Sequence, residues 1–87
     1  MIRIRATGSG ETVFTVSGRM RSANLAELRD LIEAEDESRR MALDLKEVIL
    51  VDRDAVRFLK RCESNGIELR NCSAYIRAWI KKEPDDE

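Results

Sequence analysis

The chain has 87 residues, which is enough for one small domain. Hydrophobic residues make up 43% of it and charged residues 38%, a balance typical of a soluble globular domain and not of a disordered chain. The formal net charge of -1 gives no global attraction to nucleic acid or to an anionic membrane. No apolar run approaches the roughly 20 residues that span a bilayer, and the N-terminus has no signal-peptide pattern. We therefore expect a cytoplasmic protein without membrane insertion or nucleic-acid binding.

Histidine is absent, which removes the commonest general base and the commonest metal ligand. The two cysteines, Cys62 and Cys72, are too few for a thiolate metal site of their own. The predicted topology also separates them by more than the roughly 7 Å between Cα atoms that a disulfide allows. We expect two reduced thiols, no metal and no cofactor.

The periodicity of apolar residues and the turn residues between them predict the elements of the fold. The first two strands flank a glycine-containing turn and form a β-hairpin. In chain order we predict strands at 2–5 and 12–17, a helix from about 24 that fades near 35–38, a strand at 41–45, a buried connection at 46–51, a helix at 52–64, a strand at 67–70 and a helix at 74–80. Asn24 or, alternatively, Ser22 caps the first helix, Asn65-Gly66 ends the second, and Ser73 caps the third.

Strands that are joined through helices are expected to be parallel, with right-handed crossovers. Every predicted strand alternates apolar with polar residues, whereas a parallel sheet covered on both faces would read as continuous apolar runs. We therefore predict an α/β fold of two layers, a mixed sheet of about four strands with helices mainly on one face. This single domain covers residues 1–80, and a polar tail follows at 81–87. The wet face would carry five charged side chains, namely Arg3, Arg5, Asp44, Glu68 and Arg70.

Three segments follow one another in an order that a known family shares. They are Ser17-Gly18-Arg19-Met20, Leu43-Asp44-Leu45-Lys46-Glu47-Val48 and Val51-Asp52-Arg53-Asp54-Ala55-Val56. Together they resemble the STAS domain family (sulfate transporter and anti-sigma factor antagonist), and the resemblance runs over residues 2–80 in the same order of elements. It implies a STAS-like fold.

The resemblance also implies a switch at the start of the second helix. Bacterial antagonists of the family carry Asp-Ser-Ser-Gly there, and an ATP-using, kinase-like anti-sigma factor phosphorylates the second serine, which ends binding. Asp52 matches the leading aspartate, and Arg53 replaces the first serine. Asp54 replaces the phosphorylated serine, and Ala55 replaces the glycine. Asp54 has no hydroxyl group and carries one fixed charge, where phosphoserine would carry about -1.5 to -2.

Two interpretations of Asp54 stay open. It is either a first-turn acid that interacts with the helix dipole and pairs with Arg57, or a fixed mimic of the phosphorylated serine. For Asp52 we predict an N-cap. An acid/base pair of the two aspartates is disfavoured, because an arginine lies between them and the turn is exposed. The flanking arginines, Arg53 and Arg57, are either solvated or contact an acidic partner.

From these residues and the resemblance we expect a regulatory interaction domain that is not an enzyme and has no catalytic residues. Its predicted partner-binding residues are Asp52, Arg53, Asp54, Ala55 and Arg57. The resemblance implies a bacterial signalling system that regulates transcription, with an ATP-binding anti-sigma factor or serine kinase-like protein as the partner. An accessory subunit of a transporter or other complex is the alternative. A third interpretation, an enzyme or ligand-binding module that uses Cys62 or the two aspartates, requires a reactive thiol in its cysteine form. The partner's identity, and whether the domain is a monomer or a homodimer, stay open.

Overall fold

The structure is a computed structural model that describes residues 2–8, 10–35 and 40–83. Its elements follow the predicted order β-β-α-β-α-β-α. They are β1 (Ile2–Thr7), β2 (Glu11–Met20), α1 (Ser22–Glu33), β3 (Arg40–Val51), α2 (Arg53–Ser64), β4 (Glu68–Arg70) and α3 (Ala74–Lys82).

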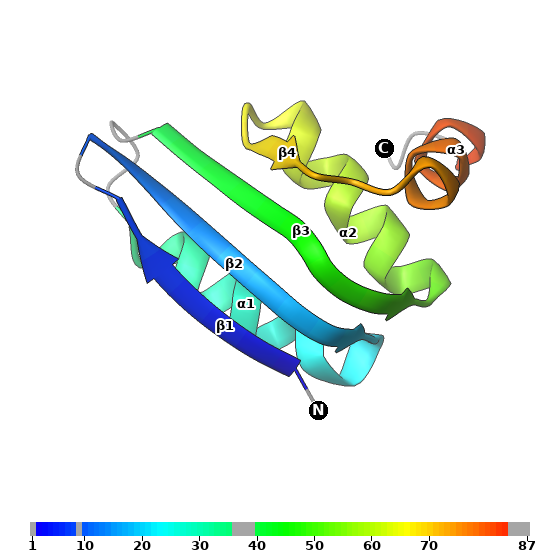
Figure 1. The fold of residues 1–87 in the computed structure, drawn as a ribbon, viewed down its shortest axis with the longest axis horizontal. Helices are drawn as coiled ribbons and strands as arrows, with labels where there is room; N and C mark the ends of the chain where they lie inside the picture. Colours follow the sequence, from blue (N-terminus) through cyan, green and yellow to red (C-terminus); the bar gives the residue numbers. More distant parts are fainter. Residues whose placement is uncertain (1, 9, 36–39, 84–87) are drawn as a thin grey trace.

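The strands form one mixed sheet in the order β1-β2-β3-β4. β1 and β2 form the predicted antiparallel hairpin, and β2, β3 and β4 run parallel to one another. Figure 1 looks onto this sheet, with α1 behind β1 and β2, while α3 packs against α2. The predicted α/β fold with a four-stranded mixed sheet is confirmed.

The core lies between the sheet and the helices that cover it. Phe14 and Val16 point into it from alternate positions of β2, as the period-two pattern predicts. Leu28 of α1 and Leu59 of α2 reach it from the helices, and both are completely buried. Each such side chain contributes about 1.5–3 kcal/mol by leaving water, so these contacts hold both helices on the sheet.

The opposite face of the sheet carries charged side chains, as predicted. Arg70 of β4 reaches across β3 to Glu11 of β2, with 2.8 Å between Nη2 and Oε1, and it also pairs with Glu68 at 3.0 Å. Asn71 donates a hydrogen bond to the Asp44 carboxylate over 3.0 Å, and this bond is the largest of the effects that lower the pKa of Asp44. The polar face is therefore tied together by side chains from three strands.

β3 is longer than the sequence pattern predicts. The predicted buried connection at 46–51 is wrong, because these residues continue to pair with β2 as far as Val51, which lies opposite Met20. Two register shifts in this pairing interrupt the alternation of inward and outward side chains, which conceals the strand in the sequence. Most of the segment is also not buried, since Ile49 is 72% exposed and Leu50 is 42% exposed, while Val51 at its end is buried.

The start of α1 also differs from the prediction. Arg21 occupies the N-cap position, so neither Asn24 nor Ser22 is the cap. Asn24 instead lies in the first turn, and its side-chain oxygen accepts a hydrogen bond from the Arg21 backbone N–H over 3.3 Å. The helix ends at Glu33, and residues 36–38 of its predicted end lie outside the described residues.

The end of α2 and the start of α3 follow the prediction more closely. Asn65 caps the end of α2, and Gly66 follows with the positive φ of 91° that favours glycine. Ser73 caps α3 as predicted. The predicted tail begins later than Lys81, because α3 continues to Lys82 and Glu83 is buried. Residues 84–87 of that tail lie outside the described residues.

Candidate functional site

Asp52 connects the beginnings of two helices. Its Oδ1 accepts a hydrogen bond from the Ala55 backbone N–H over 2.8 Å, which is the predicted N-cap of α2. Its Oδ2 accepts a second bond from the Ser22 backbone N–H, at the first residue of α1, over 2.9 Å. One carboxylate therefore satisfies N–H groups that neither helix can pair internally. The second bond is not predicted from the sequence, because its partner lies 30 residues away.

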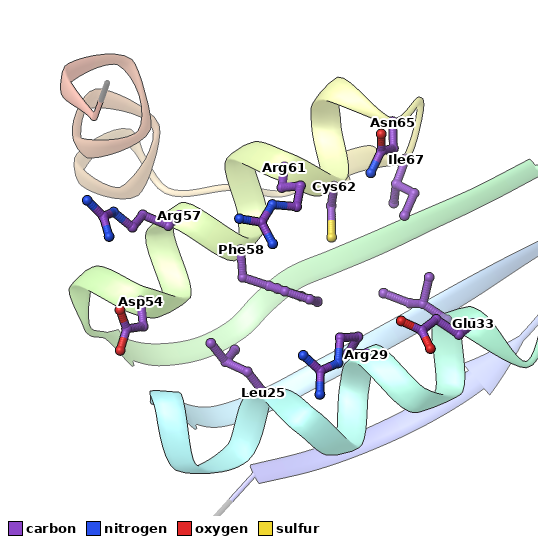
Figure 2. A pocket seen from close by; sticks show the side chains of 11 residues that line it. Leu25, Arg29, Glu33, Asp54, Arg57, Phe58, Arg61, Cys62, Asn65 and Ile67 are labelled. Atoms are coloured by element: carbon purple, nitrogen blue, oxygen red, sulfur yellow. The ribbon is translucent and has the colours of Figure 1, made fainter. Parts of the chain in front are cut away.

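Asp54 lies where the sequence places it, in the first turn of α2 with an exposed side chain. Within the part of the chain that the structure describes, its carboxylate has no hydrogen bond and no ion pair. The predicted pairing with Arg57 is not formed. Figure 2 shows the Arg57 side chain directed away from Asp54, toward α3. Asp54 thus presents an exposed carboxylate at the start of a helix, with no hydrogen bond or ion pair to another described side chain.

Both arginines of this turn contact Glu83, just beyond the end of α3. The distance from Arg53 Nε to the carboxylate is 3.4 Å, and the distance from Arg57 Nε is 3.3 Å. Trp79 Nε1 donates a hydrogen bond to the same carboxylate over 3.3 Å, and Lys60 donates one to the Glu83 carbonyl oxygen. The sequence does not indicate Glu83 as a candidate residue, because nothing in the local sequence distinguishes it from the polar residues around it.

The environment of Glu83 affects its ionisation in two directions. Burial by itself raises the pKa of its carboxyl group, but the Trp79 hydrogen bond and the guanidinium groups of Arg53 and Arg57 together hold that pKa below its usual range. The carboxylate is therefore ionised at neutral pH, although its side chain is only 8% exposed.

The five predicted partner-binding residues do not lie in equivalent surroundings. Ala55 is completely buried, so its methyl group packs in the core. Asp52 is half-buried and holds the backbone of two helices. Arg53, Asp54 and Arg57 are exposed, and we refer to these three side chains as the α2 tip. Of the five predicted residues, only the three of the α2 tip are exposed charged groups that a partner can reach from solvent.

A groove of about 430 Å³ lies between α1 and α2, and Asp54 and Arg57 line one end of it. Figure 2 shows Phe58 projecting into the gap between the helices, and Leu25, Ile32 and Cys62 also line the groove. The helical spacing in the sequence predicts Leu25, Ile32 and Cys62 on the apolar faces of their helices, with Phe58 flanking that face. It does not predict that the helices leave a groove between them.

The thiols are not poised to react. Burial raises the pKa of Cys62 to about 12 and also raises that of Cys72, and both cysteines are free. At pH 8 the thiolate of Cys62 is on the order of 1,000-fold scarcer than that of an ordinary cysteine. We expect iodoacetamide to modify Cys62 more than about 100-fold faster in urea than in the folded protein, as measured by mass spectrometry. Equal rates in both states would restore the interpretation of Cys62 as a reactive thiol.

No group of three or more His, Cys, Asp or Glu side chains that could hold a metal ion occurs at 2–8, 10–35 or 40–83. No helix in the same ranges is long and apolar enough to cross a membrane.

The sequence matches no protein-family model and no curated protein. The structure, by contrast, has a STAS-like fold. It is similar to the crystal structure of an antisigma-factor antagonist, a STAS domain from Rhodobacter sphaeroides, with a TM-score of 0.55 and 19% sequence identity. The match covers 84% of this chain and 92% of that one. Similarity at this identity shows the fold, and it confirms the fold that the resemblance in the sequence predicts.

Proposed function

We propose that this chain is a regulatory, non-catalytic domain of bacterial signalling that binds a protein partner through the α2 tip. The STAS-like fold, which it shares with an antisigma-factor antagonist, supports this proposal. The observation that carries it is Asp54, an exposed carboxylate without a hydrogen bond or ion pair in the described part of the chain, with the exposed side chains of Arg53 and Arg57 on the same turn. A compact surface of mixed charge is suited to orient a charged partner, more than to bind it tightly by itself.

Binding at the α2 tip is not switched by phosphorylation of a hydroxyl group there. No serine, threonine or tyrosine occurs from Asp52 to Glu63. Asp54 offers no hydroxyl group to phosphorylate, whereas phosphorylation of a serine adds, and dephosphorylation removes, a charge of about -1.5 to -2. The charge of this surface is fixed, so any regulation acts on the partner or elsewhere on the domain.

The partner that we propose is an ATP-binding anti-sigma factor or serine kinase-like protein. Its docking surface would place a basic group opposite Asp54 and an acidic group opposite the arginines, since opposite charges across an interface align the two proteins. Because the α2 tip is exposed, these attractions are screened by salt, and the association rate should fall as ionic strength rises.

The test is a charge reversal at Asp54 with a matched control. The partner is first captured from the native organism with the wild-type domain and then purified. We expect Asp54→Arg to weaken its binding at least about tenfold, because like charges placed opposite one another in an interface cost more than about 1.4 kcal/mol. Isothermal titration calorimetry measures the effect.

Asp30→Arg is the control, since Asp30 is another exposed helical aspartate whose carboxylate has no hydrogen bond or ion pair among the described residues, but it lies on α1. We expect this variant to change the affinity by less than about twofold. Equal losses in the two variants, or no loss in either, would move the binding surface away from the α2 tip.

A further inference from the structure

The arginines of the α2 tip already hold a carboxylate. Both Nε atoms lie within 3.4 Å of Glu83, one at each carboxylate oxygen. The arginine side chains remain 62% and 42% exposed, while the carboxylate between them is largely covered. The pair therefore forms a small carboxylate-binding site that opens toward solvent at the surface where the partner is proposed to bind.

We propose that Arg53 and Arg57 form a binding site for an acidic segment of the partner, and that Glu83 occupies this site until the partner displaces it. This inference rests on the proposed function of the α2 tip and names the chemistry of the partner that it contacts. Ion pairs of exposed arginines contribute little to stability, so exchange of one carboxylate for another is inexpensive. While Glu83 is bound, the apparent affinity for the partner falls in proportion to the fraction of empty sites.

The contact of Glu83 is not required to hold α3 on α2. Arg77 of α3 forms a second ion pair with Glu63 of α2, in which one Nη1 atom lies 2.9 Å and 2.8 Å from the two carboxylate oxygens. Ile76 and Ile80 of α3 are buried in the core. These contacts remain when Glu83 leaves the arginines, so displacement does not require α3 to detach.

Trp79 reports directly on the position of Glu83. It is the only tryptophan in the chain, and its indole N–H donates a hydrogen bond to the Glu83 carboxylate. We expect a hexaglutamate peptide to shift the indole N–H resonance of the wild-type domain in a saturable manner, because the peptide replaces Glu83 on the arginines. A hexaglycine peptide should leave the resonance unchanged, and so should hexaglutamate added to the double variant Arg53→Gln, Arg57→Gln.

The decisive comparison uses Glu83→Gln and Glu63→Gln. Glu83→Gln keeps the shape of the side chain but removes the charge that competes for the arginines, so we expect hexaglutamate to bind it at least about threefold more tightly than the wild type. Glu63→Gln breaks an ion pair between the same two helices without changing the site, and its affinity for the peptide should match that of the wild type.

Equal affinity of Glu83→Gln and the wild type would overturn the inference, and so would an equal gain in Glu63→Gln. Should Glu83→Gln fail to fold, the Trp79 titration of the wild type decides the question, since an unmoved resonance at saturating peptide contradicts displacement. The experiments also distinguish failure of the proposed binding at the α2 tip from failure of the proposed displacement of Glu83. If Asp54→Arg weakens the captured partner but hexaglutamate leaves Trp79 unmoved, the α2 tip remains the binding surface and only the role of Glu83 is lost.

Discussion

Replacing Asp52 with alanine is expected to destabilise the domain by about 2–3 kcal/mol, the sum of a lost N-cap and a lost charged hydrogen bond to a second helix. The variant leaves the Ala55 and Ser22 N–H groups without their acceptor. A domain of this size has a total stability of only about 4–13 kcal/mol, so the loss is a large part of it. Urea denaturation followed by circular dichroism measures the change.

Two further variants separate the contributions to this effect. Asp52→Asn keeps a single oxygen acceptor and should lose about half as much as alanine, because only one of the two N–H groups can still be paired. Asp54→Ala removes the neighbouring acid, which interacts only with the helix dipole, and should cost no more than about 1 kcal/mol. If Asp52→Ala cost as little as Asp54→Ala, the bridge between the two helices would have no energetic role.

The bridge through Asp52 ties the start of α2, and with it the backbone of the α2 tip, to neighbouring elements. Asp52 also donates its backbone N–H to the Met20 carbonyl oxygen, at the end of β2, over 3.2 Å. The residue before α2 is therefore attached to a neighbouring strand and to a neighbouring helix at once. Because the backbone at the start of α2 is already held in place, it needs little further ordering when a partner binds, and this reduces the entropic cost of association.

The sequence predicts the fold well where each signal is local. The alternation around Phe14, the helical spacing of Val56 and Leu59, and the turn at Asn65-Gly66 all depend on neighbours within a few residues. β3 beyond residue 45 escapes prediction because register shifts disturb the alternation, and pairing with a partner strand cannot be inferred from one strand alone.

The candidate site likewise contains features that local sequence signals predict and features that they do not. The cap at Asp52 and the exposure of Asp54 are predicted, because both follow from the first turn of one helix. The contacts of Asp52 with Ser22, and of Glu83 with Arg53, join residues 30 positions apart in the sequence. Such contacts follow from the packing of whole elements, and no local pattern marks Glu83 as different from the acids after it.

Introducing serine at position 54 should create a phosphorylation site that the wild-type domain lacks. The side chain there is exposed in the first turn of α2, accessible to a kinase. A phosphate group at that point is stabilised by the positive end of the helix dipole and by the neighbouring arginines. We therefore expect Asp54→Ser to gain one phosphate when it is incubated with ATP and the captured kinase-like partner, as measured by intact mass and peptide mapping.

The chain supplies its own control for this gain of function. Ser73 is an exposed serine at the start of α3, and it should stay unmodified if the partner recognises the α2 tip and not any serine that precedes a helix. Phosphate on the wild-type segment 52–63 would contradict a fixed charge at this surface, and an ATP-hydrolysing partner that leaves Asp54→Ser unmodified would contradict the proposed class of partner.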